Sequence, residues 1–366
     1  MGELRVRSAL VTGANRGIGL GFVQHLLALP NPPEWVFAGC RDPKGQRAQE
    51  LQKLASKHPN LVIVPLEVTD PASIKAAAAS VGERLKGSGL NLLINNAGIV
   101  RANRLENETL KDMSEVYTTN TIAPLLLGQA FLPLLKKAAQ ESPGSGMSCS
   151  KAAIVNISSN GGSIKEVYLW EGIQAACYRC SKAALNMLTR CQSMGYREHG
   201  IFSVALHPGW VQTDLGCEGG AMVGASLCWV HPQPVLVSHG GLLSPGALHQ
   251  DPLRGPVPSA PWQLSLPGDP CAAPALALAA PPPGFPALTL CPGLCFPLGG
   301  AAAFLQPGSR AQPGQPLGTH ARVSPSALQP PLTVDASVGG MLKVLSNLSE
   351  KDSGAFLDWE GNAVAW

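Results

Sequence analysis

Two side chains that could together move a proton stand four residues apart in this sequence. Tyr178 and Lys182 lie in a segment with a helical pattern, so both project from the same helix face. A free tyrosine has a pKa of about 10, and a neighbouring ammonium group stabilises the phenolate and lowers that pKa. The phenol could then protonate a carbonyl oxygen, or take a proton from an alcohol. The spacing alone is common and gains meaning beside the next motif.

A glycine-rich segment near the start of the chain has the spacing of a phosphate-binding loop. Thr12-Gly13-Ala14-Asn15-Arg16-Gly17-Ile18-Gly19 follows an apolar run at 8–11 and opens a predicted helix. Glycine lets the backbone approach a pyrophosphate, and the helix N-terminus offers free amides and a positive dipole end. The spacing is G-x-x-x-G-x-G, not the more common G-x-G-x-x-G. In this context it predicts a dinucleotide site; the alternative is an ordinary strand-to-helix turn.

The end of the second predicted strand, at 35–40, bears on which dinucleotide is bound. Enzymes selective for NAD place an acidic side chain there to hold the ribose 2′-hydroxyl. Here Arg41 and Asp42 follow the strand. Arg41, helped by Arg16, could pair with a 2′-phosphate because guanidinium matches phosphate geometry, whereas Asp42 could serve a 2′-hydroxyl. We expect NADP(H), with NAD as the alternative.

The segments that would position these residues alternate between strand and helix patterns. We expect strands at 8–11, 35–40, 61–66, 90–95, 152–158 and 202–207, and helices at 21–28, 46–56, 71–86 and 178–196, with one or two helices at 110–137. The strand runs are continuously apolar, as burial on both faces of a parallel sheet requires. The alternation predicts an α/β fold, a Rossmann-type doubly wound parallel sheet with helices on both faces.

The composition changes abruptly after Gly216. Residues 217–331 hold 22 of the 33 prolines, six charged residues and no lysine. Proline at this density blocks helix propagation, so we expect a low-complexity, Pro/Gly-rich, disordered insert. A helix pattern at 334–348 and a strand pattern at 354–359 follow. We expect one dinucleotide-binding domain made of 1–216 and 332–366. The insert is interpreted as translated non-coding sequence, such as a retained intron; the rival interpretation is a docking insert rich in polyproline II.

The glycine loop, the pair Tyr178 and Lys182 and four further motifs follow one another in the order typical of the short-chain dehydrogenase/reductase family, and the chain resembles that family. The additional motifs are Asn95-Asn96-Ala97-Gly98, Asn120, Ser158-Ser159 and Pro208-Gly209. The resemblance covers 8–216 and 332–366. Within the family it is closest to the carbonyl reductases near the sniffer and C-factor-like proteins, a likeness carried by 178–186 and 354–361.

The resemblance implies a role for each matching residue. Tyr178 would be the general acid/base, Lys182 would tune it and hydrogen-bond the nicotinamide ribose, Ser159 would polarise the substrate carbonyl, and Asn120 would hold a water in a proton relay. Contacts with the cofactor would come from Tyr178, Lys182, Gly13, Asn15, Arg16, Gly17, Ile18, Gly19, Arg41, Val68, Asn95, Asn96, Ala97, Gly98, Pro208, Gly209, Val211 and Thr213. Asn95 and Asn96 could instead simply end a strand, and Ser158 could satisfy local backbone groups.

The implied activity is NADPH-dependent reduction of an aldehyde, ketone or quinone, which makes a small carbonyl compound the expected partner. The alternatives are a catalytically impaired, cofactor-binding isoform and an NAD-linked alcohol or hydroxysteroid dehydrogenase. The resemblance allows a homodimer or homotetramer.

Two departures from the family pattern concern the site. Glu67 stands where the family often has Asp near the adenine. Ser159 and Tyr178 are 19 residues apart, more than in many members. Residues 161–176 should therefore form a longer loop, in which Tyr168 and Trp170 either line the substrate pocket or pack as surface aromatics.

Charge and composition bound the remaining partners. The net charge is +3 without a dense basic run, which argues against nucleic acid. No signal peptide is recognisable, and no uninterrupted apolar run reaches about 18 residues, so we expect a cytoplasmic protein without a membrane span. Cys177 and Cys180 form a C-x-x-C without a second pair, which favours plain thiols over a metal or redox site.

Overall fold

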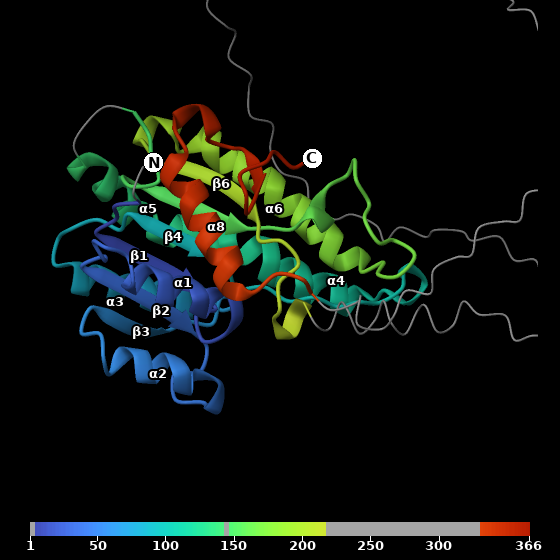
Figure 1. Cartoon of the computed structure of the whole chain (residues 1–366), viewed down its shortest axis with the longest axis horizontal. Coiled ribbons are helices and arrows are strands. Elements are labelled where there is room, and N and C mark those ends of the chain that lie inside the picture. Colours follow the sequence, from blue (N-terminus) through green and yellow to red (C-terminus); the bar gives the residue numbers. More distant parts are fainter. Residues whose placement is uncertain (1–3, 143–145, 217–329) are drawn as a thin grey trace, which may run out of the picture. The chain divides into compact units, whose positions relative to one another are not determined.

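The computed structural model describes residues 4–142, 146–216 and 330–366, and these form a seven-stranded, all-parallel sheet (Figure 1). The strand order is β3-β2-β1-β4-β5-β6-β7. It reverses between β1 and β4, where a crevice opens at the carboxyl ends of the strands in this class of sheet. The strands are β1 Ser8–Thr12, β2 Trp35–Cys40, β3 Leu61–Pro65, β4 Leu92–Asn95, β5 Ala153–Ile157, β6 Phe202–His207 and β7 Phe356–Asp358.

Helices cover both faces of the sheet, which confirms the predicted fold class. Neighbouring residues of a strand point to opposite faces, so Leu10 and Val11 of β1 belong to different core clusters. The cluster around Val11 includes side chains of α1, α2 and α8, and the cluster around Leu10 includes side chains of α3 and α5. The helices are α1 Gly17–Leu27, α2 Gln49–Ala55, α3 Pro71–Leu85, α4 Leu110–Tyr117, α5 Ala123–Glu141, α6 Ala176–Gly195 and α8 Val334–Asn347.

The start of α3 follows from the local sequence, whereas other helix bounds differ from the predicted ones. The Asp70 carboxylate accepts a hydrogen bond from the Ala72 amide at 2.9 Å and caps α3, which opens with Pro71. The long pattern predicted at 110–137 resolves into α4 and α5, joined by one π-helical turn at Thr118–Ile122. The predicted helix at 21–28 begins earlier, because α1 includes the last two glycines of the loop.

The segment after the proline-rich stretch completes the same sheet. β7 pairs with β6 through Ala205 and Phe356, and α8 packs against α1. A Cβ at Gly21 of α1 would lie 2.5 Å from Cγ1 of Val334, so glycine permits this close approach. The described residues belong to one compact unit. The predicted disorder of 217–331 therefore falls almost wholly outside the described residues, and the domain boundaries stay a prediction.

The helical stretch Leu110–Glu141 is long and apolar enough to cross a membrane by length and composition. Its α5 part contributes Leu127, Phe131 and Leu135, each at most 1% exposed, to the core beneath the sheet. Core helices of α/β proteins pass the same test of composition. The stretch therefore carries no argument for a membrane span.

Candidate active site

The glycine loop connects β1 to α1 in a conformation that requires glycine. Gly13 and Gly17 have φ angles of 63° and 53°, in the left-handed region that other residues avoid. A Cβ at Gly19 would overlap the carbonyl oxygen of Gly13. Arg16 stands at the N-cap of α1 without a side-chain cap bond, and Asn15 and Ile18 are partly exposed. The first turn of α1 thus lacks a side-chain cap, and its binding of a pyrophosphate stays a prediction.

Asn96, after β4, shapes this loop. Its side-chain amide donates hydrogen bonds to the carbonyl oxygens of Thr12 at 2.9 Å and Gly13 at 3.3 Å. The Thr12 hydroxyl accepts bonds from the backbone amides of Asn96 and Ala97, both at 3.0 Å. The chain after β4 is therefore fastened to the glycine loop, and Asn96 holds the loop's backbone.

Asn95 lies one residue earlier and points the other way. Its side chain is 3% exposed and donates a hydrogen bond to Oδ1 of Asn156 in β5 at 2.8 Å. The resemblance implied a cofactor contact for Asn95, but the structure places this side chain in the interior. Val68, also predicted at the cofactor, is 7% exposed and packs in the core cluster that includes α3.

Tyr178 and Lys182 lie side by side in the first turns of α6. The Lys182 ammonium nitrogen is 5.6 Å from the centre of the Tyr178 ring and donates to the carbonyl oxygen of Ile157 at 2.8 Å. Ser159 is close as well: a Cβ at Gly161 would lie 3.3 Å from its hydroxyl and 3.6 Å from Cε1 of Tyr178. The predicted catalytic tyrosine, lysine and serine thus lie close together, at the carboxyl end of β5 and the start of α6.

Burial controls the pKa values of this pair. Desolvation lowers the pKa of Lys182 to about 8 and raises the pKa of Tyr178 above its usual value, while a hydrogen bond with Ser159 and the charge of Arg179 oppose that rise. The net shift is opposite to the predicted lowering of the Tyr178 pKa, because desolvation outweighs the Ser159 hydrogen bond and the charge of Arg179. Tyr178 is therefore a protonated acid at neutral pH.

Asn120 lies in the π-helical turn between α4 and α5 and is 1% exposed. Its side chain accepts a bond from the Ile99 amide and donates to the Ile99 carbonyl oxygen, both at 2.9 Å, and it also donates to the Ser181 hydroxyl at 3.0 Å. A Cβ at Gly98 would lie 3.2 Å from Oδ1 of Asn120 and 3.7 Å from Nζ of Lys182. Asn120 thus lies behind Lys182, at a π-turn of the kind that often marks functional sites.

The segment after β6 forms a wall of the site. Gly209 has a φ of 81°, and a Cβ there would lie 2.7 Å from Cδ2 of Leu332. The buried Ser337 hydroxyl of α8 donates to the Pro208 carbonyl oxygen at 2.6 Å, and Val211 forms a β-bridge with Leu332. The part of the chain that follows the proline-rich stretch therefore holds the predicted cofactor wall in place.

This wall reaches the glycine loop. A Cβ at Gly17 would lie 3.3 Å from the Thr213 methyl group, and Arg16 forms an ion pair with Asp214. A hollow of about 490 Å³ lies beside this contact. Its lining is rich in cations and polar groups: Asn15, Arg16, Gln46, Arg47, Gln49, Glu50, Lys53 and Asp214.

The two side chains that compete over cofactor choice have different surroundings. The Arg41 side chain is 81% exposed, with its guanidinium 3.5 Å from the Glu67 carboxylate. Asp42 folds back onto its own turn, where its carboxylate accepts a hydrogen bond from the Lys44 amide at 3.2 Å and contacts Gly45. Arg41 is therefore exposed and held only by one long ion pair with Glu67, while the Asp42 carboxylate is engaged in a turn.

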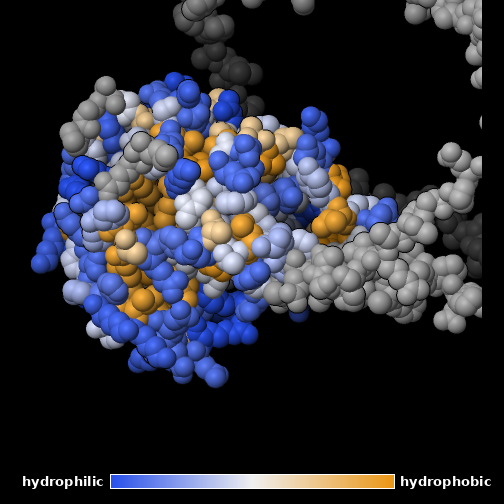
Figure 2. Space-filling view, viewed as in Figure 1, coloured by the Kyte–Doolittle hydropathy of each residue, from blue (hydrophilic) through white to orange (hydrophobic). Residues whose placement is uncertain are grey.

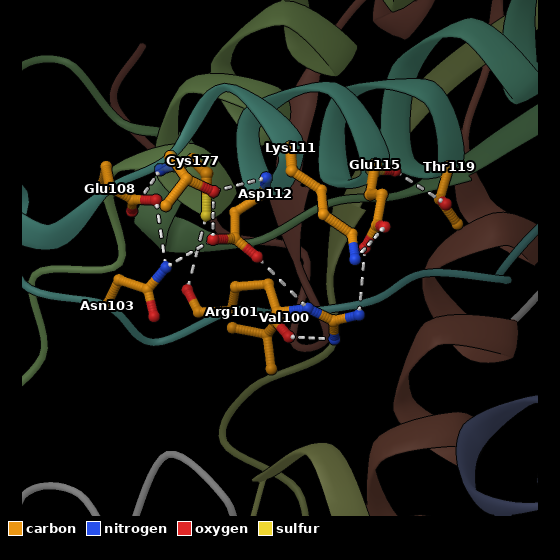
Figure 3. A network of polar contacts seen from close by, with 10 residues as sticks. Val100, Arg101, Asn103, Glu108, Lys111, Asp112, Glu115, Thr119 and Cys177 are labelled. Carbon is orange, nitrogen blue, oxygen red and sulfur yellow. Dashed lines mark hydrogen bonds and ion pairs between the residues drawn. The ribbon is translucent and has the colours of Figure 1, made fainter.

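Sequence reasoning missed the polar network that fastens the start of α6 (Figure 3). The Glu108 carboxylate accepts a hydrogen bond from the Cys177 amide at 3.0 Å, and the Cys177 thiol donates to the Arg101 carbonyl oxygen at 3.4 Å. Burial and Glu108 raise the pKa of this thiol to about 12, which disfavours a reactive thiolate. No signal in the sequence links Glu108 to α6, because 69 residues separate the two.

The chain matches the model of a known protein family. Residues 7–222 match the short chain dehydrogenase family model. The chain belongs to the short-chain dehydrogenase family. Its members are oxidoreductases, and the predicted resemblance is confirmed.

Solved structures of two carbonyl reductases are similar to the chain. The NADPH-bound carbonyl reductase from chicken fatty liver is 61% identical, with a TM-score of 0.68, and the match covers 100% of this chain and 96% of that one. The carbonyl reductase Sniffer of D. melanogaster is 28% identical, with a TM-score of 0.65, and the match covers 99% and 100%.

A curated relative, estradiol 17-beta-dehydrogenase 2 of Mus musculus, is 32% identical over 212 residues, which is 57% of this chain and 49% of the relative. The chain thus spans about half the length of the first curated relatives it matches.

Proposed function

We propose that this short-chain dehydrogenase reduces the carbonyl group of an aldehyde, ketone or quinone with NADPH. The observation that carries the proposal is the meeting of Tyr178, Lys182 and Ser159 at the carboxyl edge of the sheet. On the same edge, the glycine loop presents the uncapped first turn of α1. The similarity to an NADPH-bound carbonyl reductase at 61% identity supports the same activity.

The residues present fit a dinucleotide with a 2′-phosphate. The glycine loop accepts a pyrophosphate because its glycines leave backbone amides accessible. Arg41 is exposed at the end of β2, and the adjoining hollow adds Arg16, Arg47 and Lys53. Guanidinium groups suit phosphate, whereas the Asp42 carboxylate is bonded within its own turn. These contacts favour NADP(H) over NAD.

The chemistry follows from the protonation states. When bound, the nicotinamide supplies the hydride that adds to the carbonyl carbon. The Tyr178 hydroxyl, whose pKa burial raises, donates its proton to the carbonyl oxygen, so hydride and proton together give the alcohol. The Ser159 hydroxyl holds the same oxygen by a hydrogen bond. Lys182, fixed to the Ile157 carbonyl oxygen, places positive charge beside the developing phenolate.

The test uses the full chain, NADPH oxidation with a panel of aldehydes, ketones and quinones, and two matched variants. Tyr178→Phe is expected to lower kcat at least about 100-fold, the usual contribution of a general acid, without weakening NADPH binding. Tyr196→Phe, a half-buried tyrosine just after the end of α6, is expected to leave kcat unchanged.

Each contrary result has a distinct meaning. Full activity of Tyr178→Phe would overturn the proposed chemistry. NADPH binding by the native chain without turnover of any carbonyl would favour the catalytically impaired isoform. Faster turnover with NAD and a hydroxysteroid than with NADPH and a carbonyl compound would favour the dehydrogenase alternative. The similarity to estradiol 17-beta-dehydrogenase 2 is the reason to test it.

A further inference from the structure

The loop between Ser159 and Tyr178 is long and presents apolar side chains to solvent. Ile164 is 81% exposed, and Val167, Tyr168 and Leu169 are 50–55% exposed. The loop extends beyond the sheet near α4 in Figure 1, and Figure 2 shows hydrophobic residues on this part of the molecule. An exposed apolar loop next to a catalytic pair is suited to contact the apolar part of a substrate.

Arg179, the residue after Tyr178, holds this loop with its guanidinium group. Nε donates to the Gln174 carbonyl oxygen at 2.7 Å, and Nη2 donates to the carbonyl oxygens of Tyr168 at 2.6 Å and Ile173 at 2.8 Å. The guanidinium carbon also lies 5.9 Å from the centre of the Trp170 ring. One planar cation thus fixes three carbonyl groups and an aromatic ring, which an ammonium group cannot do in the same geometry.

The loop needs such support because part of its backbone is unfavourable. Leu169 and Ala175 have φ angles of 54° and 42°, in the left-handed region that costs residues with a side chain free energy. Such conformations persist where surrounding contacts fix them. The three bonds from Arg179 reach the carbonyl oxygens of Tyr168, Ile173 and Gln174, so they enclose Leu169 and end one residue before Ala175.

The same arginine adjoins the catalytic pair. A Cβ at Gly161 would lie 3.9 Å from Cγ of Arg179, 3.6 Å from the Tyr178 ring and 3.3 Å from the Ser159 hydroxyl. The stem of Arg179 therefore lies against the residues proposed to hold the carbonyl group, while its guanidinium holds the loop. A change in Arg179 alters the loop and its position relative to the proton donor.

We propose that Arg179 is a specificity-determining positioning residue, which holds the 163–175 loop against α6 so that its apolar side chains receive a bulky apolar or aromatic group next to the substrate carbonyl. The proposal rests on the carbonyl reductase function proposed above. It assigns no step of proton transfer to Arg179. A small aliphatic aldehyde, which has no such group, makes no use of the loop.

The first test measures the loop itself by amide hydrogen exchange on the full chain. Arg179→Met removes all three hydrogen bonds, and exchange of the amides at 166–175 is expected to quicken about tenfold, because local opening becomes easier. Arg190→Met is the matched control, since it changes an exposed arginine on the same helix. Exchange that is unchanged in Arg179→Met would overturn the proposed role.

The second test compares KM for two substrates. In Arg179→Met, KM for a bulky aryl ketone is expected to rise about tenfold, and KM for a small aliphatic aldehyde should change less than about twofold. Arg179→Lys keeps the charge without the planar fork and should recover only part of the affinity. Because the charge of Arg179 also lowers the pKa of Tyr178, kcat for both substrates can change together, so the ratio of the KM values is the decisive quantity.

The two tests separate failure of this inference from failure of the proposed function. Equal KM changes for both substrates, or none, would refute the specificity role while leaving the reductase standing. If the native chain reduces no carbonyl compound, the proposed function fails, and the exchange experiment still decides whether Arg179 holds the loop.

Discussion

Gly19→Ala tests whether close packing of the glycine loop sets cofactor binding. The new methyl group would overlap the carbonyl oxygen of Gly13 and lie 2.5 Å from Nδ2 of Asn96. Both neighbours are constrained, because Asn96 donates hydrogen bonds to the loop carbonyls. The loop must therefore move, and the amides proposed to face the pyrophosphate move with it.

The magnitude follows from two opposed effects. Replacing glycine by alanine inside a helix stabilises by roughly 0.5–1 kcal/mol. Overpacking a well-packed site costs roughly 1–3 kcal/mol. The net expectation is a loss of roughly 0.5–2 kcal/mol in the free energy of unfolding, together with an NADPH affinity lowered at least about tenfold, since about 1.4 kcal/mol of lost contact gives this factor.

Gly195→Ala provides the matched control, because it is also a helical glycine but has nothing within 4 Å of an added Cβ. This change should be neutral or stabilise slightly, and NADPH affinity should stay at the native value. The assays are urea unfolding and NADPH fluorescence titration on the full chain. A Gly19→Ala protein with native stability and native NADPH affinity would refute the reasoning.

Two further predictions concern cofactor choice and pH. Arg41→Ala should raise KM for NADPH about tenfold, by loss of a charge-assisted phosphate contact, and leave KM for NADH unchanged. Arg104→Ala, at another exposed arginine, is the control. An equal rise in KM for both cofactors in Arg41→Ala would contradict the proposed contact between Arg41 and the 2′-phosphate. The pKa of Lys182 is about 8 in the folded chain and 10.5 in a free lysine. The unfolded chain therefore binds more protons between these values, and the folded chain gains stability as pH rises from 8 toward 10.5. Lys182→Met lacks this gain, so the difference in unfolding free energy between the two proteins should change by up to roughly 3 kcal/mol across the window. Urea unfolding from about pH 7 to 9.5 measures most of this change and stays below the range where Tyr178 ionises. If the unfolding free energies of the two proteins change in parallel with pH, Lys182 is not desolvated.

The strands were predictable because their signals are local. Continuous apolar runs bounded by polar or proline-containing segments gave the bounds of β2 at 35–40 and β6 at 202–207 as the structure has them. Helix bounds were less accurate, since α1 absorbs two loop glycines and α5 continues to Glu141, beyond the predicted end at 137. The pattern at 110–137 allowed one or two helices but did not locate the π-turn between them. Such adjustments depend on contacts with other elements.

Within the candidate site, adjacent residues of the same type have different roles. The Ser158 hydroxyl is buried and donates to Asn186 at 2.6 Å, whereas Ser159 faces Tyr178. Asn95 bonds inside the sheet and Asn96 holds the glycine loop. The motifs identify each pair, but only the direction in which the chain leaves the strand decides which member points into the interior and which toward the candidate site.

The sequence by itself determined the alternation of strands and helices, the glycine loop and the four-residue spacing of Tyr178 and Lys182. These features depend on neighbours within a few residues, where helix and strand periods govern side-chain direction. The tertiary structure decided the rise in the pKa of Tyr178 and the attachment of the loop to Arg179. It also placed Glu108 against the start of α6. Burial and hydrogen bonds between distant segments exist only once the chain has folded, so no local pattern encodes them.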